Sequence, residues 1–336
     1  MINEVAADFA AAVAFGRLDL PLPGGGRTWE RWAVLADLAE EDLSLARLSE
    51  GHADALAILA ELGPDGLGPA GLGPAGLGPA GLGTVPPPGG SRWGVWAAQP
   101  PGPGLTASRA AAGWRLDGIK RYCSGARSCT HALVTAAAPD GTRLFAVATD
   151  DLAPVAGTWP ATGMAGSDTL DVEFTDIAAE PVGDPGGYTG RPGFAHGGAG
   201  VAACWYGGAR GVGQTLLAAA AKRDVGPHAL AHLGAVDLAL QNARDALARA
   251  AAEIDADPAD REHTGWRRTL RVRALVEATA TEVMARVGRA LGAGPLCHDE
   301  AHGRRVADLT VYLRQHHAER DLAELGALAV EAGVSW

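Results

Sequence analysis

The chain has 336 residues, of which 47% are hydrophobic, so it is long enough to bury a large core in one to three domains. Its formal net charge of −11 argues against nucleic acid or an anionic membrane as the principal partner, because both require a basic face. An anionic cofactor is not excluded, since a local cluster of arginines binds phosphate inside an acidic protein.

The chain carries no sign of export or membrane insertion. Its first residues, MINEVAADFAAAVAFG, include Glu4 and Asp8 and lack the basic region that begins a signal peptide. No apolar run reaches the roughly 18 residues that span a bilayer. The four cysteines show neither CxxC pairing nor zinc-finger spacing, so we expect reduced thiols. These features predict a soluble cytoplasmic protein.

Residues 1–92 are expected to form an N-terminal helical region with a Gly/Pro-rich loop at 64–90. Apolar residues recur at three- and four-residue steps in 41–62, which predicts a helix that ends at Gly63 and Pro64. A GLGPA repeat follows between Gly66 and Gly83. Its regular prolines exclude a helix and it offers few groups that offset the entropy of ordering, so we interpret it as an exposed spacer.

Residues 93–195 are expected to form a middle β-domain. Short β-like runs are separated by turn signals such as Pro139-Asp140-Gly141. The runs cover 93–98, 113–124, 131–136, 143–149 and 169–174. Several short strands at this spacing favour a sandwich or a small barrel.

Residues 196–336 return to a helical pattern. Long amphipathic segments are predicted at 197–222, 228–254, 265–291 and 301–332, with breaks at Gly226-Pro227, at Asp257-Pro258 and in a glycine-rich turn at 292–295. Long helices with short joints indicate an antiparallel four-helix bundle. The predicted class is therefore α+β: N-terminal helices, a middle β-barrel or sandwich, and a C-terminal four-helix bundle.

This order resembles the acyl-CoA dehydrogenase superfamily, and the clearest matching motif is GWRLDGIKRYCSG at 113–125. It is similar to the family's G-x-x-L-x-G-x-K-x-W-I-[ST]-N-G hairpin, which runs behind the isoalloxazine ring of FAD. The resemblance implies that Tyr122 and Ser124 lie beside that ring. Strand alternation would put both side chains on one face, where the aromatic ring can stack and the hydroxyl can hydrogen-bond. Without the family, the segment is an ordinary strand with an aromatic residue.

Three further motifs extend the resemblance from about residue 42 to residue 326. The segment 159–177 is similar to the strand that closes the family's β-domain, a structural role. RDVGPHALAHL at 223–233 resembles a helix start whose arginine contacts the FAD diphosphate across the dimer, which implies that role for Arg223. VGRALGAG at 287–294 resembles a turn that meets the adenosine diphosphate, which implicates Gly292 and Gly294. A cation at a helix C-terminus and a helix C-cap are the structural alternatives.

The loop that binds flavin and substrate in the family is altered here. AAQPPGP at 97–103 puts Gln99 and Pro100 where the family has Glu-Pro. The hydroxyl and acidic groups of the family loop are missing. We therefore expect flavin contacts at Gln99 to depend on backbone groups.

The catalytic glutamate of the family is missing from both of its known positions. One position, counted from Asp308, holds His316, and the other, counted back from Gly207-Gly208, holds Val201. A titrating imidazole near a flavin can act as an acid or base, so His316 is the catalytic candidate. The adjacent His317 is an alternative, and a slip of one turn in the count would bring in Glu319. The alternative is a polar pair of histidines on an exposed helix.

We expect no metal site, since His298 and His302 share a helix face without an evident third ligand. The resemblance implies an FAD-dependent oxidoreductase that acts on an acyl-CoA or related acyl substrate. A flavin-dependent monooxygenase supplied by a flavin reductase, and a non-catalytic protein of the same fold, remain alternatives. We expect a small-molecule acyl substrate, an electron acceptor or reductase, and a homodimer or homotetramer.

Overall fold

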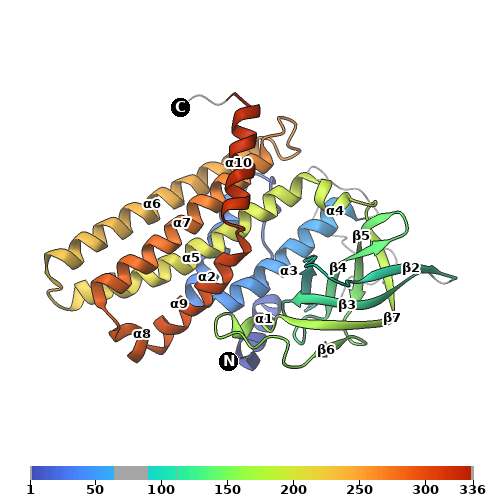
Figure 1. Cartoon of the computed structure of the whole chain (residues 1–336), viewed down its shortest axis with the longest axis horizontal. Coiled ribbons are helices and arrows are strands. Elements are labelled where there is room, and N and C mark those ends of the chain that lie inside the picture. Colours follow the sequence, from blue (N-terminus) through green and yellow to red (C-terminus); the bar gives the residue numbers. More distant parts are fainter. Residues whose placement is uncertain (1, 64–89, 112, 334–336) are drawn as a thin grey trace. The chain divides into compact units, whose positions relative to one another are not determined.

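The computed structural model describes residues 2–63, 90–111 and 113–333 (Figure 1). The GLGPA repeat, and with it nearly all of the loop predicted at 64–90, lies outside the described residues. Within the described ranges, no helix combines the length and the hydropathy that a membrane span requires.

The predicted order of helices, β-domain and helices is confirmed. The chain divides into two compact units, each of which is described by itself. Unit 1 comprises Met1–Gly25, Arg47–Ala161 and Ala165–Phe194, and unit 2 comprises Gly26–Ala46, Thr162–Met164 and Ala195–Trp336. The predicted domain boundaries at residues 92 and 195 stay predictions.

Unit 1 is built on a sheet that closes into a barrel. Its strands are β1 (Trp93–Trp96), β2 (Thr106–Ala110), β3 (Gly113–Cys123), β4 (His131–Ala138), β5 (Gly141–Ala148), β6 (Ala153–Val155) and β7 (Leu170–Val182). The hydrogen-bonded order is β1-β4-β2-β3-β7-β5, and β5 also pairs with β4, which closes the ring. β6 pairs with β7. The strands β2 and β6 had no counterpart among the predicted runs, and β7 extends beyond the predicted end at residue 174.

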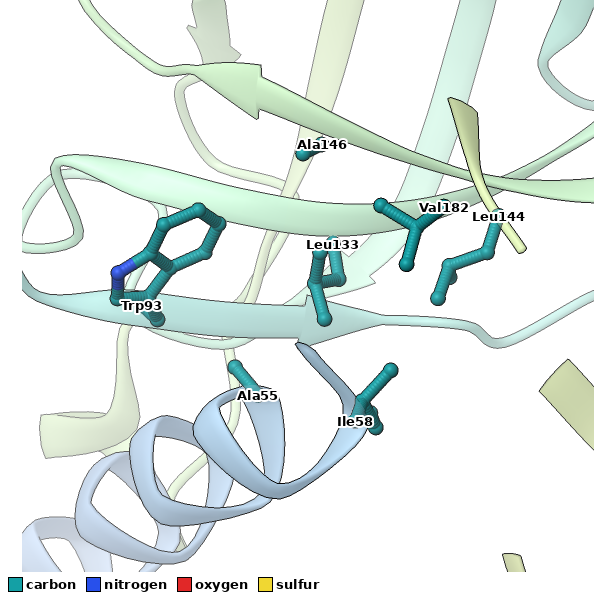
Figure 2. Close-up of a cluster of buried hydrophobic side chains, with 7 residues drawn as sticks. All are labelled: Ala55, Ile58, Trp93, Leu133, Leu144, Ala146 and Val182. Carbon is teal, nitrogen blue, oxygen red and sulfur yellow. The ribbon is translucent and has the colours of Figure 1, made fainter. Parts of the chain in front are cut away.

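A helix from the N-terminal region supplies part of the core of unit 1. Helix α3 (Leu43–Leu62) presents Ala55 and Ile58 to the sheet, where they meet Trp93 of β1 and Leu133 of β4 (Figure 2). These side chains are almost fully buried, so the helix and the sheet share one apolar cluster. Unit 1 also contains α1 (Ile2–Ala14), the 3-10 turn η1 (Ala165–Ser167) and α4 (Gly187–Gly190).

Unit 2 is helical. It contains α2 (Thr28–Glu41), α5 (Pro192–Lys222), α6 (Gly226–Ala256), α7 (Gly265–Leu291), α8 (Gly294–His298), α9 (Glu300–Tyr312), the 3-10 turn η2 (Leu313–Gln315) and α10 (Glu319–Glu331) (Figure 1). Glycines let backbone segments of unit 2 approach closely. A Cβ added at Gly207 of α5 would lie 2.0 Å from the carbonyl oxygen of Ala36, and one added at Gly163, in the segment before η1, would lie 2.1 Å from the carbonyl oxygen of Ala307.

The last predicted helix is interrupted. A single helix was expected at 301–332, but the chain leaves the helical conformation between η2 and α10. His316 is extended and Ala318 has φ 49°, a left-handed conformation that is strained for alanine. The prediction was wrong here because the segment contains neither glycine nor proline, the residues that normally announce such a break.

Candidate functional site

In unit 1, a chain of hydroxyl groups joins the end of β3 to the start of β7. The hydroxyl of Ser124 lies 3.0 Å from that of Thr169, which lies 2.8 Å from the hydroxyl of Ser167. The indole of Trp96 donates to the backbone oxygen of Ser124 at 2.9 Å. Ser124 is 8% exposed, so this predicted flavin contact sits in a nearly closed polar network.

The turn after β3 is fixed by a buried carboxylate. Asp168 has φ 47° and accepts hydrogen bonds from the backbone N–H and the guanidinium of Arg127. The backbone N–H groups of Gly125 and Ala126 donate to the carbonyl oxygens of Ser167 and Asp168. These bonds pin the β3 end to the β7 start, which holds the hydroxyl chain in place.

Tyr122 does not share a face with Ser124, which corrects the expectation from strand alternation. The pairing of β3 with β7 shifts register between Lys120 and Cys123, and Tyr122 adopts φ 62°. Such a bulge reverses the alternation, because one extra residue is inserted against the partner strand. The ring of Tyr122 is 52% exposed, so it is available to stack on a flat ligand while Ser124 points inward.

A buried lysine lies behind the same strand, and sequence reasoning assigned it no role. The ammonium of Lys120 donates to the carbonyl oxygen of Thr135 at 2.7 Å and to its hydroxyl at 2.8 Å. Burial lowers the pKa of Lys120 to about 8. The hydroxyl of Thr135 donates onward to the carbonyl oxygen of Ala97, at the start of the loop that carries the exposed Gln99. Lys120 therefore helps to tie β3 and β4 to that loop.

In unit 2, His316 lies at the break between η2 and α10 and is 5% exposed. Its Nδ1 accepts a hydrogen bond from the backbone N–H of Ala318 at 3.2 Å. Its Nε2 makes no hydrogen bond with the described residues and lies 3.8 Å from the carboxylate of Asp321. Burial lowers the pKa of His316, and the Asp321 carboxylate opposes that shift.

Two side chains from other helices surround this imidazole. Arg273 of α7 donates to the carbonyl oxygen of Gln315 at 2.6 Å and to that of Gly198 at 3.0 Å. Its guanidinium lies 4.6 Å from the ring centre of Trp205, a cation–π contact. The Trp205 ring meets His316 edge to face at 6.5 Å. The residue before His316 is thus held by a buried arginine that sequence reasoning missed.

The two alternative catalytic residues lie on the surface. His317 is exposed, and both its backbone N–H and its Nδ1 contact the carboxylate of Asp321, at 3.0 and 3.2 Å. Glu319 is exposed in the first turn of α10. Of the three candidates, His316 alone is enclosed by other side chains.

Unit 2 separates His316 from the residues predicted to hold the diphosphate. Arg223 follows the C-terminus of α5, Gly292 caps the C-terminus of α7 with φ 67°, and Gly294 opens α8; all three are exposed. Arg273, which contacts the turn before His316, lies toward the N-terminal end of α7. At 1.5 Å per residue it is about 28 Å along the helix from Gly292. One copy of the chain does not bring these groups together.

His298 and His302, the two histidines considered as metal ligands, have different surroundings. His302 is buried and its Nδ1 shares a 2.9 Å hydrogen bond with the hydroxyl of Thr215, whereas His298 is exposed. No cluster of three or more His, Cys, Asp or Glu side chains suited to a metal ion occurs in the part of the chain that the structure describes.

Comparison of the whole structure with solved structures finds extensive matches. TdsC, the dibenzothiophene monooxygenase of Paenibacillus sp. A11-2, in complex with FMN and indole, is 18% identical over 96% of this chain and 94% of its own, with a TM-score of 0.73. The chain has the acyl-CoA dehydrogenase fold. KijD3, in complex with FMN and a dTDP-linked amino keto sugar, is 20% identical over 98% of this chain and 86% of its own, at a TM-score of 0.76.

A third match carries the same fold. The nitrososynthase of Micromonospora carbonacea var. africana is 18% identical over 99% of this chain and 95% of its own, with a TM-score of 0.70. No family model matches the sequence, and no curated protein matches it either. At these identities the likeness establishes the fold, and the site residues stay predictions.

Proposed function

We propose that the chain is a flavin-dependent oxidoreductase of the monooxygenase kind. The observation that carries this proposal is the buried imidazole of His316 at the position where an acyl-CoA dehydrogenase is expected to have its catalytic glutamate. The other glutamate position holds Val201, an apolar residue buried in α5. Without a carboxylate at either position, removal of a proton next to a thioester lacks its usual base.

The residues present fit a flavin. The exposed ring of Tyr122 offers a stacking surface at the end of β3, whereas the hydroxyl of Ser124 is nearly buried and paired with that of Thr169. A bound flavin would supply electron transfer and oxygen activation, chemistry that side chains do not provide. The chain would supply binding, orientation and a hydrogen-bonding imidazole. The FMN complexes of TdsC and KijD3 support FMN, while the resemblance to acyl-CoA dehydrogenases supports FAD.

The first experiment identifies the flavin and the reaction class. The purified protein is titrated with FMN and with FAD, and binding is followed by quenching of flavin fluorescence. The bound protein is then mixed anaerobically with acyl-CoA thioesters, or aerobically with reduced flavin from a reductase and aromatic or amino-sugar substrates. Oxygen-dependent product formation supports a monooxygenase. Bleaching of the flavin by an acyl-CoA, without oxygen or reductase, would instead support the acyl-CoA dehydrogenase reaction.

The role of His316 is tested against a matched histidine. His316→Ala is expected to lower turnover by about 100-fold, the lower end of the range for losing a positioned acid–base or donor group. His298→Ala removes an exposed imidazole elsewhere in unit 2 and should leave turnover unchanged. Equal turnover of the two variants, with flavin bound in both, would remove His316 from the mechanism.

We also propose that the complete site is shared between copies in a homo-oligomer. Arg223 and Gly292 follow the C-terminal ends of α5 and α7, whereas His316 lies toward the N-terminal ends of the same helices. A single flavin that contacts all three residues would therefore draw them from two chains. Differently tagged His316→Ala and Arg223→Glu chains are co-expressed and the mixed oligomer is isolated. Subunit sharing predicts that the mixture regains activity that neither variant has alone. A mixture no more active than its parents would contradict sharing.

A further inference from the structure

The imidazole of His316 is buried in an arrangement that restricts where its proton can lie. A backbone N–H always donates, so the ring atom that accepts from the Ala318 N–H must carry a lone pair and no hydrogen. That atom is Nδ1, and a neutral imidazole with a lone pair on Nδ1 carries its hydrogen on Nε2. Ala318 itself has φ 49°, at the break in the helix that leaves its N–H free to reach the ring.

The cationic form of His316 is disfavoured by the same contact. Protonation at Nδ1 would set two N–H donors against each other across 3.2 Å. The ring is also almost completely withdrawn from water, and burial of a charge costs free energy unless a partner offsets it.

The charged groups around the ring do not reverse this preference. The charged or titratable groups that act on its pKa are Arg273 and Glu277 of α7, the neighbouring His317 and Asp321 of α10. Arg273 adds positive charge, and Glu277 is paired with Arg314 at 2.7 Å. The carboxylate of Asp321 already receives both donors of His317, and at 3.8 Å from Nε2 it is beyond hydrogen-bond range.

Resting on the proposed function, we propose that His316 acts as a neutral hydrogen-bond donor through Nε2–H to an acceptor atom of the bound ligand, and not as a proton acceptor. The Nε2 atom is buried and makes no hydrogen bond with the described residues, so it is the ring atom with a donor to offer. A base would need its lone pair on Nε2 and its hydrogen on Nδ1, which the Ala318 N–H opposes.

Arg273 is the positioning residue in this arrangement. Its two hydrogen bonds join the carbonyl oxygen of Gln315, just before His316, to that of Gly198 on α5. Its guanidinium also covers the Trp205 ring that meets the imidazole. It therefore fixes the turn and places a positive charge near the ring, and both effects favour the neutral form.

The tautomer is measured on the protein without any ligand. Protein with all ten histidines labelled with 15N is examined by long-range 1H–15N NMR, and the His316 signal is assigned by its loss in His316→Gln. The proposal expects a neutral ring with the hydrogen on Nε2 from about pH 6 to about pH 8, across the range where an ordinary histidine titrates. A hydrogen on Nδ1, or a cationic ring at about pH 7, would overturn it.

The positioning role is tested by the same signal. Arg273→Leu is expected to raise the pKa of His316 and to lose the single tautomer, and Arg273→Lys, which keeps the charge, should hold the pKa low. An unchanged His316 signal in Arg273→Leu would remove Arg273 from the proposal. If Arg273→Leu does not fold, the wild-type spectrum still decides the tautomer, and Arg273→Lys shows whether the charge alone suffices.

The donor role is tested by flavin binding. Glutamine places an amide N–H near the position of Nε2, whereas asparagine places one near Nδ1. His316→Gln should keep flavin affinity within about threefold, and His316→Asn and His316→Ala should weaken it about tenfold, the loss of one hydrogen bond. Equal affinity in all three variants would overturn the donor role. A wild-type chain that binds no flavin would contradict the proposed function, while the NMR result would still fix the tautomer.

Discussion

Asp308 offers a direct test of the electrostatics of unit 2. Its carboxylate is 4% exposed and accepts the backbone N–H of Met164, in the short segment that belongs to unit 2 although its neighbours in sequence belong to unit 1. Burial raises the pKa of Asp308 from 3.8 to about 6. The hydrogen bond from Met164 and the charges of Arg304 and Arg305 oppose this shift, and the nearby Asp42 carboxylate adds to it.

The sign and the size of the effect follow from that shift. Between the unfolded value and the folded value, the folded chain binds more protons than the unfolded chain. The free energy of unfolding therefore falls as the pH rises through this window. For pKa values of 3.8 and about 6, the Asp308 contribution falls by about 2 kcal/mol between about pH 4.5 and about pH 7.5.

The perturbation is Asp308→Asn, which keeps an oxygen acceptor for the Met164 N–H and removes the titration. Urea unfolding of the wild type and the variant is compared at each pH, so that titrations common to both chains cancel. The stability of Asp308→Asn relative to the wild type should rise by about 2 kcal/mol over this range. Asp245→Asn, a change at an exposed carboxylate of α6, serves as the control and should show no such rise. A pH-independent difference for Asp308→Asn would refute the reasoning.

Three other substitutions test packing and buried charge. Gly163→Ala should lower the free energy of unfolding by about 1–3 kcal/mol, seen by urea unfolding, because its Cβ would meet the Ala307 carbonyl at 2.1 Å. Glu61→Gln should lower the free energy of unfolding by about 3 kcal/mol in the same assay, because it leaves the buried guanidinium of Arg191 without its carboxylate partner at 2.7 Å. Glu61→Asp keeps a carboxylate and should retain most of the stability. The pKa of Lys120, lowered to about 8, predicts that stability rises by about 2 kcal/mol from about pH 7 to about pH 9.5, and Lys120→Met should abolish that rise.

The order of helices, β-domain and helices was predictable because helices and strands repeat their apolar residues at different spacings. Helical segments such as 265–291 carry apolar residues at helical steps, and the observed α7 has the predicted bounds. The β-domain was predicted from short runs, but β2 was not, since TASRA is mostly exposed and offers no buried face. Its place in the barrel is set by pairing with β3, a tertiary contact that no local pattern carries.

The local geometry around the predicted site residues could not be foreseen from the sequence, because it depends on departures from the regular periods of strand and helix. The bulge before Cys123 separates Tyr122 from Ser124, and strand alternation could not foresee it. Arg273 is one of several arginines in α7, and nothing in the sequence distinguishes the two that turn inward, Arg268 and Arg273.

The break at His316 shows how a local departure from the helix sets the hydrogen bonding of a side chain. In the continuous helix that the pattern predicted, the N–H of Ala318 would donate to a carbonyl oxygen four residues earlier and the imidazole would lie on a helix surface. The break frees that N–H, and it donates to Nδ1 instead. The positive φ of Ala318, 49°, therefore occurs at the same break that gives Nδ1 its donor. A chain with a regular helix here would have the same histidine with a different hydrogen bond at Nδ1.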